Sequence, residues 1–138
     1  MISKYKMQVL IIDSSIRIIE RLEEIISEAE TVTTINKAVS YGEAKKLFEK
    51  NKYDMVLLDI DLPENESLQI LKEIKKASGK PCVIILFTYI DNYIQEQYKF
   101  FGTDYFFDKY YDFEKISGLL CSLSFINTKN DFEKRKSG

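Results

Sequence analysis

The chain has 138 residues, about the length of a single domain, and its 45% hydrophobic and 30% charged residues are typical of a globular protein. Its net charge of −2 gives no indication of a nucleic-acid surface, and its lack of histidine excludes His-based triads, His-ligated metals and a phosphohistidine carrier. We expect no leader segment, no apolar run in the sequence is long enough to span a membrane, and Cys82 and Cys121 form no CxxC motif. We therefore expect a cytoplasmic protein that binds neither nucleic acid nor membrane.

The first half of the chain alternates apolar runs with helical patterns. The run Gln8 to Asp13 predicts a strand that ends in an acid, and Ser14 and Ser15 are candidate caps for the helix that follows. The β-branched residues 31–35 predict a second strand, and Ser40 to Glu43 has the form of a capping box for a second helix. The predicted apolar face of the first helix consists of Ile16, Ile19, Leu22, Ile25, Ile26 and Ala29.

The central feature of the sequence is the stretch Tyr53 to Pro63, YDMVLLDIDLP. Four consecutive apolar residues, 55–58, indicate a strand that is covered on both faces, as in a parallel sheet. Asp59 and Asp61 follow at its carboxyl end, which is the edge where open α/β sheets bind ligands. We interpret these acids as candidate site residues; the alternative is that they are solvated turn residues.

The second half of the chain continues the alternation. A third helix is predicted to begin near Ser67, with Gly79 and Pro81 ending it. The remaining predicted elements are a strand over 82–87, a helix over 91–101, a strand over 105–107, and a last helix that Asp112 caps, with Phe113, Ile116, Leu119, Leu120 and Leu123 on its apolar face.

Five successive strand–helix units predict an α/β fold with a parallel sheet and helices on both faces. Right-handed crossovers leave few topologies, and we predict the flavodoxin-like (βα)5 doubly wound sheet with strand order 2-1-3-4-5. We expect one domain over residues 1–126. The polar residues 127–138 are predicted to be a tail or the start of a linker.

Such a sheet brings the ends of its strands to one edge, where Asp13, Asp59, Thr88 and Lys109 would meet. Carboxylates bind a hard cation such as Mg²⁺, which takes phosphate oxygens in its remaining positions. An aspartate beside the metal is a possible nucleophile that forms an aspartyl-phosphate, while a lysine and a threonine neutralise the phosphate oxygens. The sequence therefore predicts a phosphoryl-transfer site.

The chain resembles a response-regulator receiver domain of two-component signalling. The resemblance covers about Lys6 to Phe125 and rests on the motifs VLIIDSS, DMVLLDIDLP, IILFT and FFDK, which occur in the right order and spacing. It implies that Asp59 is the phosphoacceptor. It also implies a Mg²⁺ site formed by Asp13, Asp59 and Asp61, to which Asp61 contributes its backbone carbonyl.

The same resemblance implies a switch and a partner. Thr88 matches the switch hydroxyl, Phe106 its aromatic partner and Lys109 the phosphate-binding lysine. The implied phosphoryl donor is a sensor histidine kinase or a phosphotransfer protein, which brings the histidine that this chain lacks. The chain would then be a signalling domain and not an enzyme, apart from self-catalysed phosphorylation and dephosphorylation.

The acidic pair of the family is incomplete in this chain. Ser14 stands where the family usually carries a second metal-binding acid, so the affinity for Mg²⁺ should fall unless Asp61 turns its side chain inward. With Asp13 and Asp59 facing Lys109, the pocket carries a charge of about −1 before any metal binds, ignoring Asp61. Because the acids in this pocket repel one another less than in the rest of the family, the pocket has less need of a bound cation.

Three further positions depart from the family pattern. Tyr89 follows the switch threonine where a small residue is preferred, and its ring could narrow access to Asp59. Tyr110 replaces the usual proline after the lysine, so the loop is expected to differ. Ser67 occupies a position that is often glycine.

Twelve of the chain's 18 aromatic residues lie between Phe87 and Phe113. Strand alternation and helical periodicity cannot bury all of them. We expect some to lie on the surface of the fourth helix, the fifth strand and the last helix, which the family uses for homodimers and downstream partners. The alternative is that these aromatic residues form part of the core, which would explain about half of the twelve.

Three functions remain open at this point. The first is a receiver phosphorylated on Asp59. The second is a pseudo-receiver, a binding module of the same fold whose pocket is not efficiently phosphorylated because of Ser14 and Tyr89. The third, a small flavodoxin-like enzyme or nucleotide binder, is less favoured because IIDSSIR stands where a Gly-rich phosphate loop would follow the first strand.

Overall fold

The computed structural model describes residues 6–77 and 80–122 of the chain. Five strands form one sheet in the order β2-β1-β3-β4-β5, and all four neighbouring pairs are parallel. The prediction of a flavodoxin-like doubly wound sheet is therefore confirmed. The strands are β1 (Met7–Ile12), β2 (Val32–Ala38), β3 (Met55–Asp59), β4 (Cys82–Phe87) and β5 (Tyr105–Asp108).

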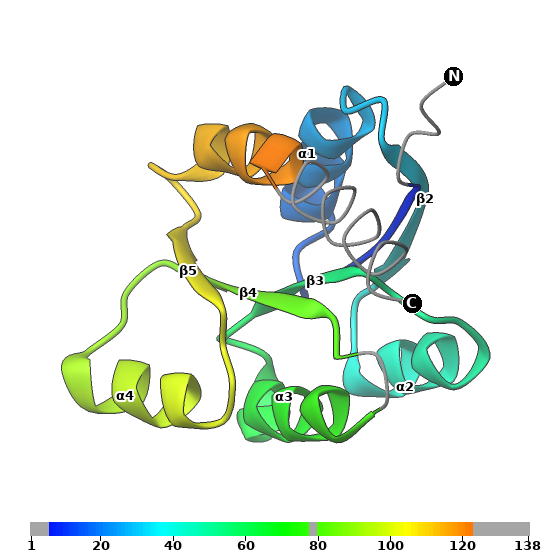
Figure 1. The fold of residues 1–138 in the computed structure, drawn as a ribbon. Helices are drawn as coiled ribbons and strands as arrows, with labels where there is room; N and C mark the ends of the chain where they lie inside the picture. The colour runs from blue at the N-terminus through cyan, green and yellow to red at the C-terminus, as the bar shows by residue number, and fades with distance from the viewer. Residues whose placement is uncertain (1–5, 78–79, 123–138) are drawn as a thin grey trace, which may run out of the picture.

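Helices cover both faces of the sheet (Figure 1). On one face lie α1 (Ile16–Ser27) and the last helix, of which residues 113–122 are described. On the other face lie α2 (Tyr41–Lys50), α3 (Glu66–Lys76) and α4 (Asn92–Phe100). None of the helices within the described ranges is long and apolar enough to cross a bilayer.

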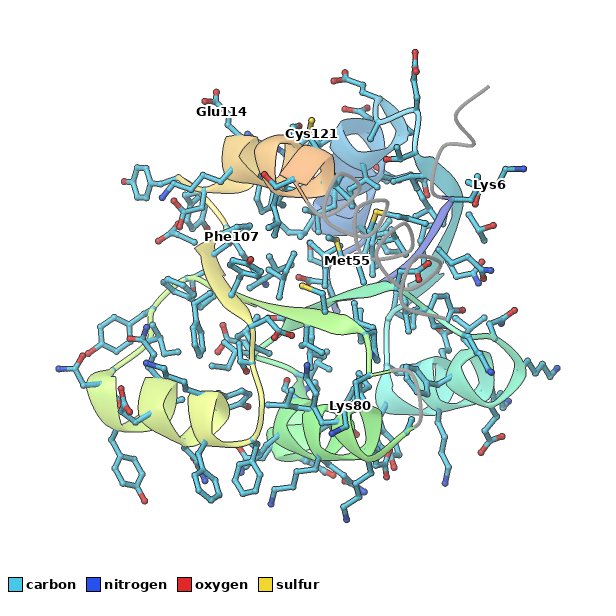
Figure 2. The ribbon with its side chains drawn as sticks, in the orientation of Figure 1. Lys6, Met55, Lys80, Phe107, Glu114 and Cys121 are labelled. Carbon is cyan, nitrogen blue, oxygen red and sulfur yellow. The ribbon has the colours of Figure 1, made fainter. Side chains whose placement is uncertain are left out.

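The sheet separates two apolar core layers, and β3 contributes to both. Met55 and Leu57 pack in the layer beneath α1 and the last helix, whereas Val56 and Leu58 pack in the layer against α2, α3 and α4. Figure 2 shows Met55 and Phe107 on the first of these sides. All five residues of β3 are buried, as an uninterrupted apolar run predicts for a central parallel strand.

The first helix follows the prediction except at its start. Ser15 is the N-cap, since its side chain accepts a hydrogen bond from the Ile18 amide at 3.4 Å. Ile19 and Leu22 are buried, but Ile16, which we predicted on the apolar face, is 63% exposed. That prediction is wrong because a residue at the first helical position lies beyond the end of the sheet layer that buries the following turns.

The second strand is longer than predicted, and the third helix begins next to the predicted Ser67. The second strand continues to Ala38 because it pairs with the whole length of β1, so tertiary hydrogen bonding extends it beyond the β-branched run. The third helix begins at Glu66, after a 3₁₀ turn over Pro63–Asn65, which places Ser67 in its first turn. Glu64 and Asn65 in that turn both have a φ of 57°, the left-handed region.

The last helix begins directly after Asp112, as predicted, but among the described residues no helix amide donates a capping hydrogen bond to the Asp112 side chain. Its Oδ2 accepts a hydrogen bond from the Asp108 amide at 2.8 Å and its Oδ1 pairs with Lys115. Phe113, Ile116 and Leu120 are buried in the core. Gly79, Leu123, the tail 127–138 and hence the predicted domain boundary lie outside the described residues.

The two cysteines differ in environment, which leads to a testable prediction. Burial, with a contribution from the charge of Asp104, raises the pKa of the half-buried Cys82 to about 12, against the opposing effect of Lys75. Cys121 is exposed. Since the thiolate is the reactive species, we expect iodoacetamide at pH 8 to alkylate Cys82 about 10³-fold more slowly than an ordinary thiol.

The measurement is peptide mass spectrometry over time, with unfolding in guanidinium as the control that equalises both thiols. A C121S variant keeps Cys82 as its remaining cysteine, and we expect iodoacetamide to leave it nearly unmodified. Rapid alkylation of that folded variant would contradict the assigned environment of Cys82.

Candidate functional site

Three residues from separate strand ends meet at the carboxyl edge of the sheet. Asp13 follows β1, Asp59 ends β3 and Lys109 follows β5. The Lys109 Nζ lies 2.9 Å from Asp59 Oδ1 and 2.9 Å from Asp13 Oδ2. The predicted meeting of two carboxylates and an ammonium is therefore found, because β1, β3 and β5 run parallel and end at the same edge.

This cluster is almost fully buried. Asp13, Asp59 and Lys109 are 0%, 1% and 7% exposed. Backbone amides donate to one oxygen of each carboxylate: the Ser15 amide donates to Asp13 Oδ1 at 2.8 Å, and the Asp61 amide donates to Asp59 Oδ1 at 2.9 Å. Buried charges persist only when they are paired, and here the Lys109 ammonium pairs with both carboxylates.

The charges in the cluster affect one another strongly. Burial raises the pKa of Asp13, and the charge of Asp59 adds to this, while the Ser15 amide and Lys109 oppose it. Burial acts to lower the pKa of Lys109, but its hydrogen bonds and attraction to Asp59 and Asp13 outweigh burial and raise that pKa. Lys109 is thus held as a cation between two acids, and the net charge of the three groups is about −1 (−2 + 1).

The donor set suits a metal ion only in part. Asp13 Oδ2 is buried and accepts no well-aligned hydrogen bond among the described residues, although it is close to the Lys109 ammonium. Ser14 and Asp61 are exposed, so the inward turn of Asp61 that would compensate for Ser14 is not found. The described part of the chain holds no group of three or more His, Cys, Asp or Glu residues placed to bind a metal. Two carboxylates and a backbone carbonyl are oxygen donors of the kind that Mg²⁺ takes, and they would leave several of its positions to water.

No side-chain hydrogen bond or ion pair within the described ranges joins the remaining predicted site residues, Thr88 included, to Asp13, Asp59 or Lys109. Thr88 follows β4 and is exposed, and Phe106 is half-buried against the core layer of α2, α3 and α4. Tyr89 and Tyr110 are 78% and 71% exposed. No peptide bond in the described ranges is cis, the one before Tyr110 included.

Sequence reasoning assigned Ser67 no contact with the site. This side chain is fully buried, and its hydroxyl donates a hydrogen bond to the backbone carbonyl of Asp59. The signal in the sequence is a small polar residue in the first turn of α3, eight positions after the acid. The sequence pattern alone predicts that such a serine is a helix-start residue. Neighbouring residues in the sequence do not indicate that the first turn of α3 packs against the end of β3.

Half of the twelve clustered aromatic residues are exposed. We call these exposed side chains together the aromatic surface; they lie on the loop after β4, on α4, on β5 and on the loop after β5, whereas the described part of the last helix, which was predicted to contribute, adds none. Its members are Tyr89, Tyr93, Phe100, Tyr105, Tyr110 and Tyr111.

Comparison with known proteins identifies the family. The family model described as "Response regulator receiver domain" matches residues 9–120. This chain belongs to the response-regulator receiver domains. The family is that of two-component signalling, and its receiver domains are signalling domains.

Curated relatives are longer proteins. The chain is similar to the sensory transduction protein LytT of Bacillus anthracis, with 27% identity over 130 residues that cover 94% of this chain and 48% of LytT. It is also similar to the transcriptional regulatory protein YdfI of Bacillus subtilis, with 31% identity over 63% of this chain and 40% of YdfI. The receiver domain therefore spans about half or less of the relatives it matches.

Solved structures support the same fold. The signal receiver domain of a putative Luxo repressor protein from Vibrio parahaemolyticus has a TM-score of 0.78 and 18% identity, covering 96% of this chain and 98% of that one. A signal receiver domain of an HD domain-containing protein from Pseudomonas fluorescens Pf-5 has a TM-score of 0.77 and 19% identity. The match covers 91% of this chain and 98% of that one. At these identities the likeness shows the fold alone.

Proposed function

We propose that this receiver domain accepts a phosphoryl group on Asp59 from a histidine kinase or a phosphotransfer protein in the cytoplasm, and that the modification changes the affinity of the aromatic surface for a partner. The observation that carries the proposal is the position of Lys109 Nζ, 2.9 Å from carboxylates of Asp13 and Asp59 that belong to two other strand ends. A buried ammonium between two acids is suited to neutralise an incoming phosphoryl group.

The hydrogen bonds of Asp59 support a choice between its two carboxylate oxygens. Its Oδ1 accepts from Lys109 and from the Asp61 amide, whereas its Oδ2 accepts no hydrogen bond from the described residues. We therefore assign Oδ2 as the nucleophile. The Oδ2–P bond forms as the N–P bond of the donor phosphohistidine breaks, and the electron pair of that bond returns to the imidazole nitrogen, which takes a proton from solvent.

Lys109 and Thr88 then have separate tasks. Lys109 remains beside the new phosphoryl oxygens as its bond to the carboxylate is replaced, because its ammonium is held between strand ends. Thr88 follows β4 with an exposed side chain, so its hydroxyl is free to turn toward a phosphoryl oxygen. A Mg²⁺ ion held by Asp13, Asp59 and the Asp61 carbonyl would supply neutralisation of phosphate charge during the transfer.

The aromatic surface is the proposed output. Exposed tyrosine and phenylalanine side chains are enriched where proteins bind one another. We propose that phosphorylation shifts the population of a conformation in which this surface binds a second copy of the chain or a downstream protein.

A second candidate function is favoured by a specific observation. Ser14 is neutral and exposed, and only two carboxylates of the described residues reach Lys109. These features support a pseudo-receiver that keeps the fold but takes phosphate slowly.

The Ser14→Asp variant distinguishes the two candidates. We expect it to raise the rate of phosphorylation by acetyl phosphate about 10-fold at low Mg²⁺ concentration, because a third carboxylate strengthens cation binding. The measurement is intact-protein mass over time as Mg²⁺ is titrated, with Ser14→Asn as the neutral control of similar size. Measurable labelling of the natural sequence supports the receiver. Labelling that is seen only in Ser14→Asp supports the pseudo-receiver.

A further inference from the structure

A cleft lies beside the proposed phosphoacceptor, between the loop after β3 and α4. Its volume of about 410 Å³ is within the range of about 300–1,000 Å³ that is common for binding sites in proteins. Ile60, which directly follows Asp59, is part of its lining, whereas Asp13 and Lys109 are not among the described residues that line it. A molecule in this cleft would therefore lie next to the site of modification without displacing the buried cluster.

The floor of the cleft is apolar. Ile60, Leu68 and Ile94 are partly buried and pack against the core layer of α2, α3 and α4, and Tyr98 is 5% exposed. All four side chains also line the cleft, so part of their apolar surface faces the hollow. Removing apolar surface from water is the main favourable contribution to most protein association. The floor therefore suits an apolar side chain of a partner.

The charged residues that line the cleft are acidic. Asp61 and Asp91 are both exposed, and no lysine or arginine is among the described residues of the lining. Asp91 already caps α4, since its Oδ1 accepts from the Ile94 amide at 2.8 Å. The side chain of Asp61 forms no hydrogen bond or ion pair with the described residues, and Lys109 is held between other acids. The cleft is therefore complementary to a positive charge.

Tyr89 joins the cleft to the aromatic surface. Its side chain is 78% exposed and belongs to both. The face of an exposed phenol ring attracts a guanidinium group, which also forms paired hydrogen bonds with a carboxylate. An arginine can thus use Tyr89 and Asp61 together. An occupant of this kind extends beyond the cleft onto the aromatic surface, which a small molecule within the cleft would leave uncovered.

We propose that the cleft is a docking site for a basic helical segment of a partner protein, in which an apolar side chain enters the cleft and an arginine pairs with Asp61 and covers Tyr89. Positions three or four residues apart lie on one face of a helix, so such a segment presents both side chains together. Docking to the unmodified chain stands by itself. The effect of phosphorylation on docking rests on the proposed function.

Modification of Asp59 should strengthen this docking. The Asp61 amide donates to Asp59 Oδ1 at 2.9 Å, so the loop that carries Asp61 is bound to the acceptor side chain. A phosphoryl group adds negative charge beside this loop and attracts a bound arginine. Because coupling between two sites is reciprocal, a docked segment would also favour the modified chain.

The experiment selects binders of the unmodified natural chain from a displayed library of random peptides of about 15 residues, long enough to form a helix. We expect enriched sequences to carry arginine three or four positions from leucine, isoleucine or phenylalanine. An enriched peptide is then labelled with fluorescein, and its Kd is measured by anisotropy. We expect Asp61→Asn to raise the Kd about fivefold, the effect of a favourable exposed ion pair. Glu96→Gln is the matched control, since Glu96 is exposed on α4 outside the lining and should leave the Kd unchanged.

Three outcomes would overturn the docking site. They are enrichment of sequences without basic residues, no enrichment at all, and a Kd that Asp61→Asn and Glu96→Gln change equally. Displacement of the peptide by an equal concentration of arginine amide would assign the cleft to a small cation instead. A dimer in light scattering that Asp61→Asn dissociates would assign it to a second copy of the chain.

Beryllofluoride with Mg²⁺, as the phosphoryl mimic, tests the link to Asp59. We expect it to lower the Kd of the peptide at least about threefold. An unchanged Kd at full occupancy would overturn that link. If the natural chain takes neither beryllofluoride nor acetyl phosphate, the proposed function fails, while peptide binding that depends on Asp61 would still support the docking site.

Discussion

Replacing Asp59 with asparagine is expected to reduce phosphoryl incorporation from acetyl phosphate or a phosphohistidine donor to background. The amide has nearly the same shape as the carboxylate, but its oxygen carries no charge to attack phosphorus and forms no stable acyl phosphate. The change also removes one of the two acids that hold Lys109. The measurement is intact-protein mass after incubation with Mg²⁺ and donor, followed by neutral hydroxylamine, which cleaves acyl phosphates and spares phosphoesters.

Asp91→Asn is the matched control for this experiment. Asp91 is an exposed N-cap of α4, and asparagine caps helices about as well as aspartate. This control should be phosphorylated like the natural sequence. Hydroxylamine-resistant labelling of Asp59→Asn would point to a hydroxyl acceptor such as Ser14 or Thr88, and the assignment of Asp59 would be wrong.

Replacing Lys109 with methionine is expected to lower the free energy of unfolding at pH 7 by about 3–5 kcal/mol, the usual cost of removing one partner from a buried ion pair. The reason is that Asp13 and Asp59 would face each other inside the protein without a cation. Methionine has a similar length, so lost packing contributes little. Urea denaturation followed by tyrosine fluorescence measures the change.

The destabilisation caused by Lys109→Met should depend on pH in a defined direction. The pKa of Asp13 is already raised above its ordinary value, so its carboxylate is less stable in the folded than in the unfolded chain, and removal of Lys109 increases that penalty. Protonation of the carboxylate removes this penalty. The difference in the free energy of unfolding between the Lys109→Met variant and the natural sequence should therefore shrink as the pH falls from 7 toward about 4. Lys115→Met is the control, because the side chain of Lys115 is 67% exposed and surface pairs contribute little. A destabilisation of equal size in both variants would contradict the electrostatic account.

Much of the fold follows from local patterns that the sequence displays directly. The uninterrupted apolar run 55–58 indicates a strand that is covered on both faces. Such runs alternate with helical patterns along the chain, and this alternation predicts a doubly wound parallel sheet. Once the sheet is parallel, Asp13, Asp59 and Lys109 must reach one edge. Their meeting was predictable because it depends on topology and not on side-chain detail.

Other features depend on contacts between elements that are distant in the sequence. Ile16 fits the helical period but is exposed, because burial depends on where the sheet ends relative to α1. The extra length of β2 comes from pairing with β1, not from the propensity of its own residues.

By itself the sequence determined the fold family, the strand order and the identity of the charged groups at the sheet edge, because periodicity and strand-end position are local properties. Only the tertiary structure decided that Lys109 binds both acids at once, that Asp61 faces solvent and that Ser67 holds the Asp59 peptide. Hydrogen-bond geometry depends on distances of a few tenths of an ångström between separate elements, and no one-dimensional pattern encodes those distances.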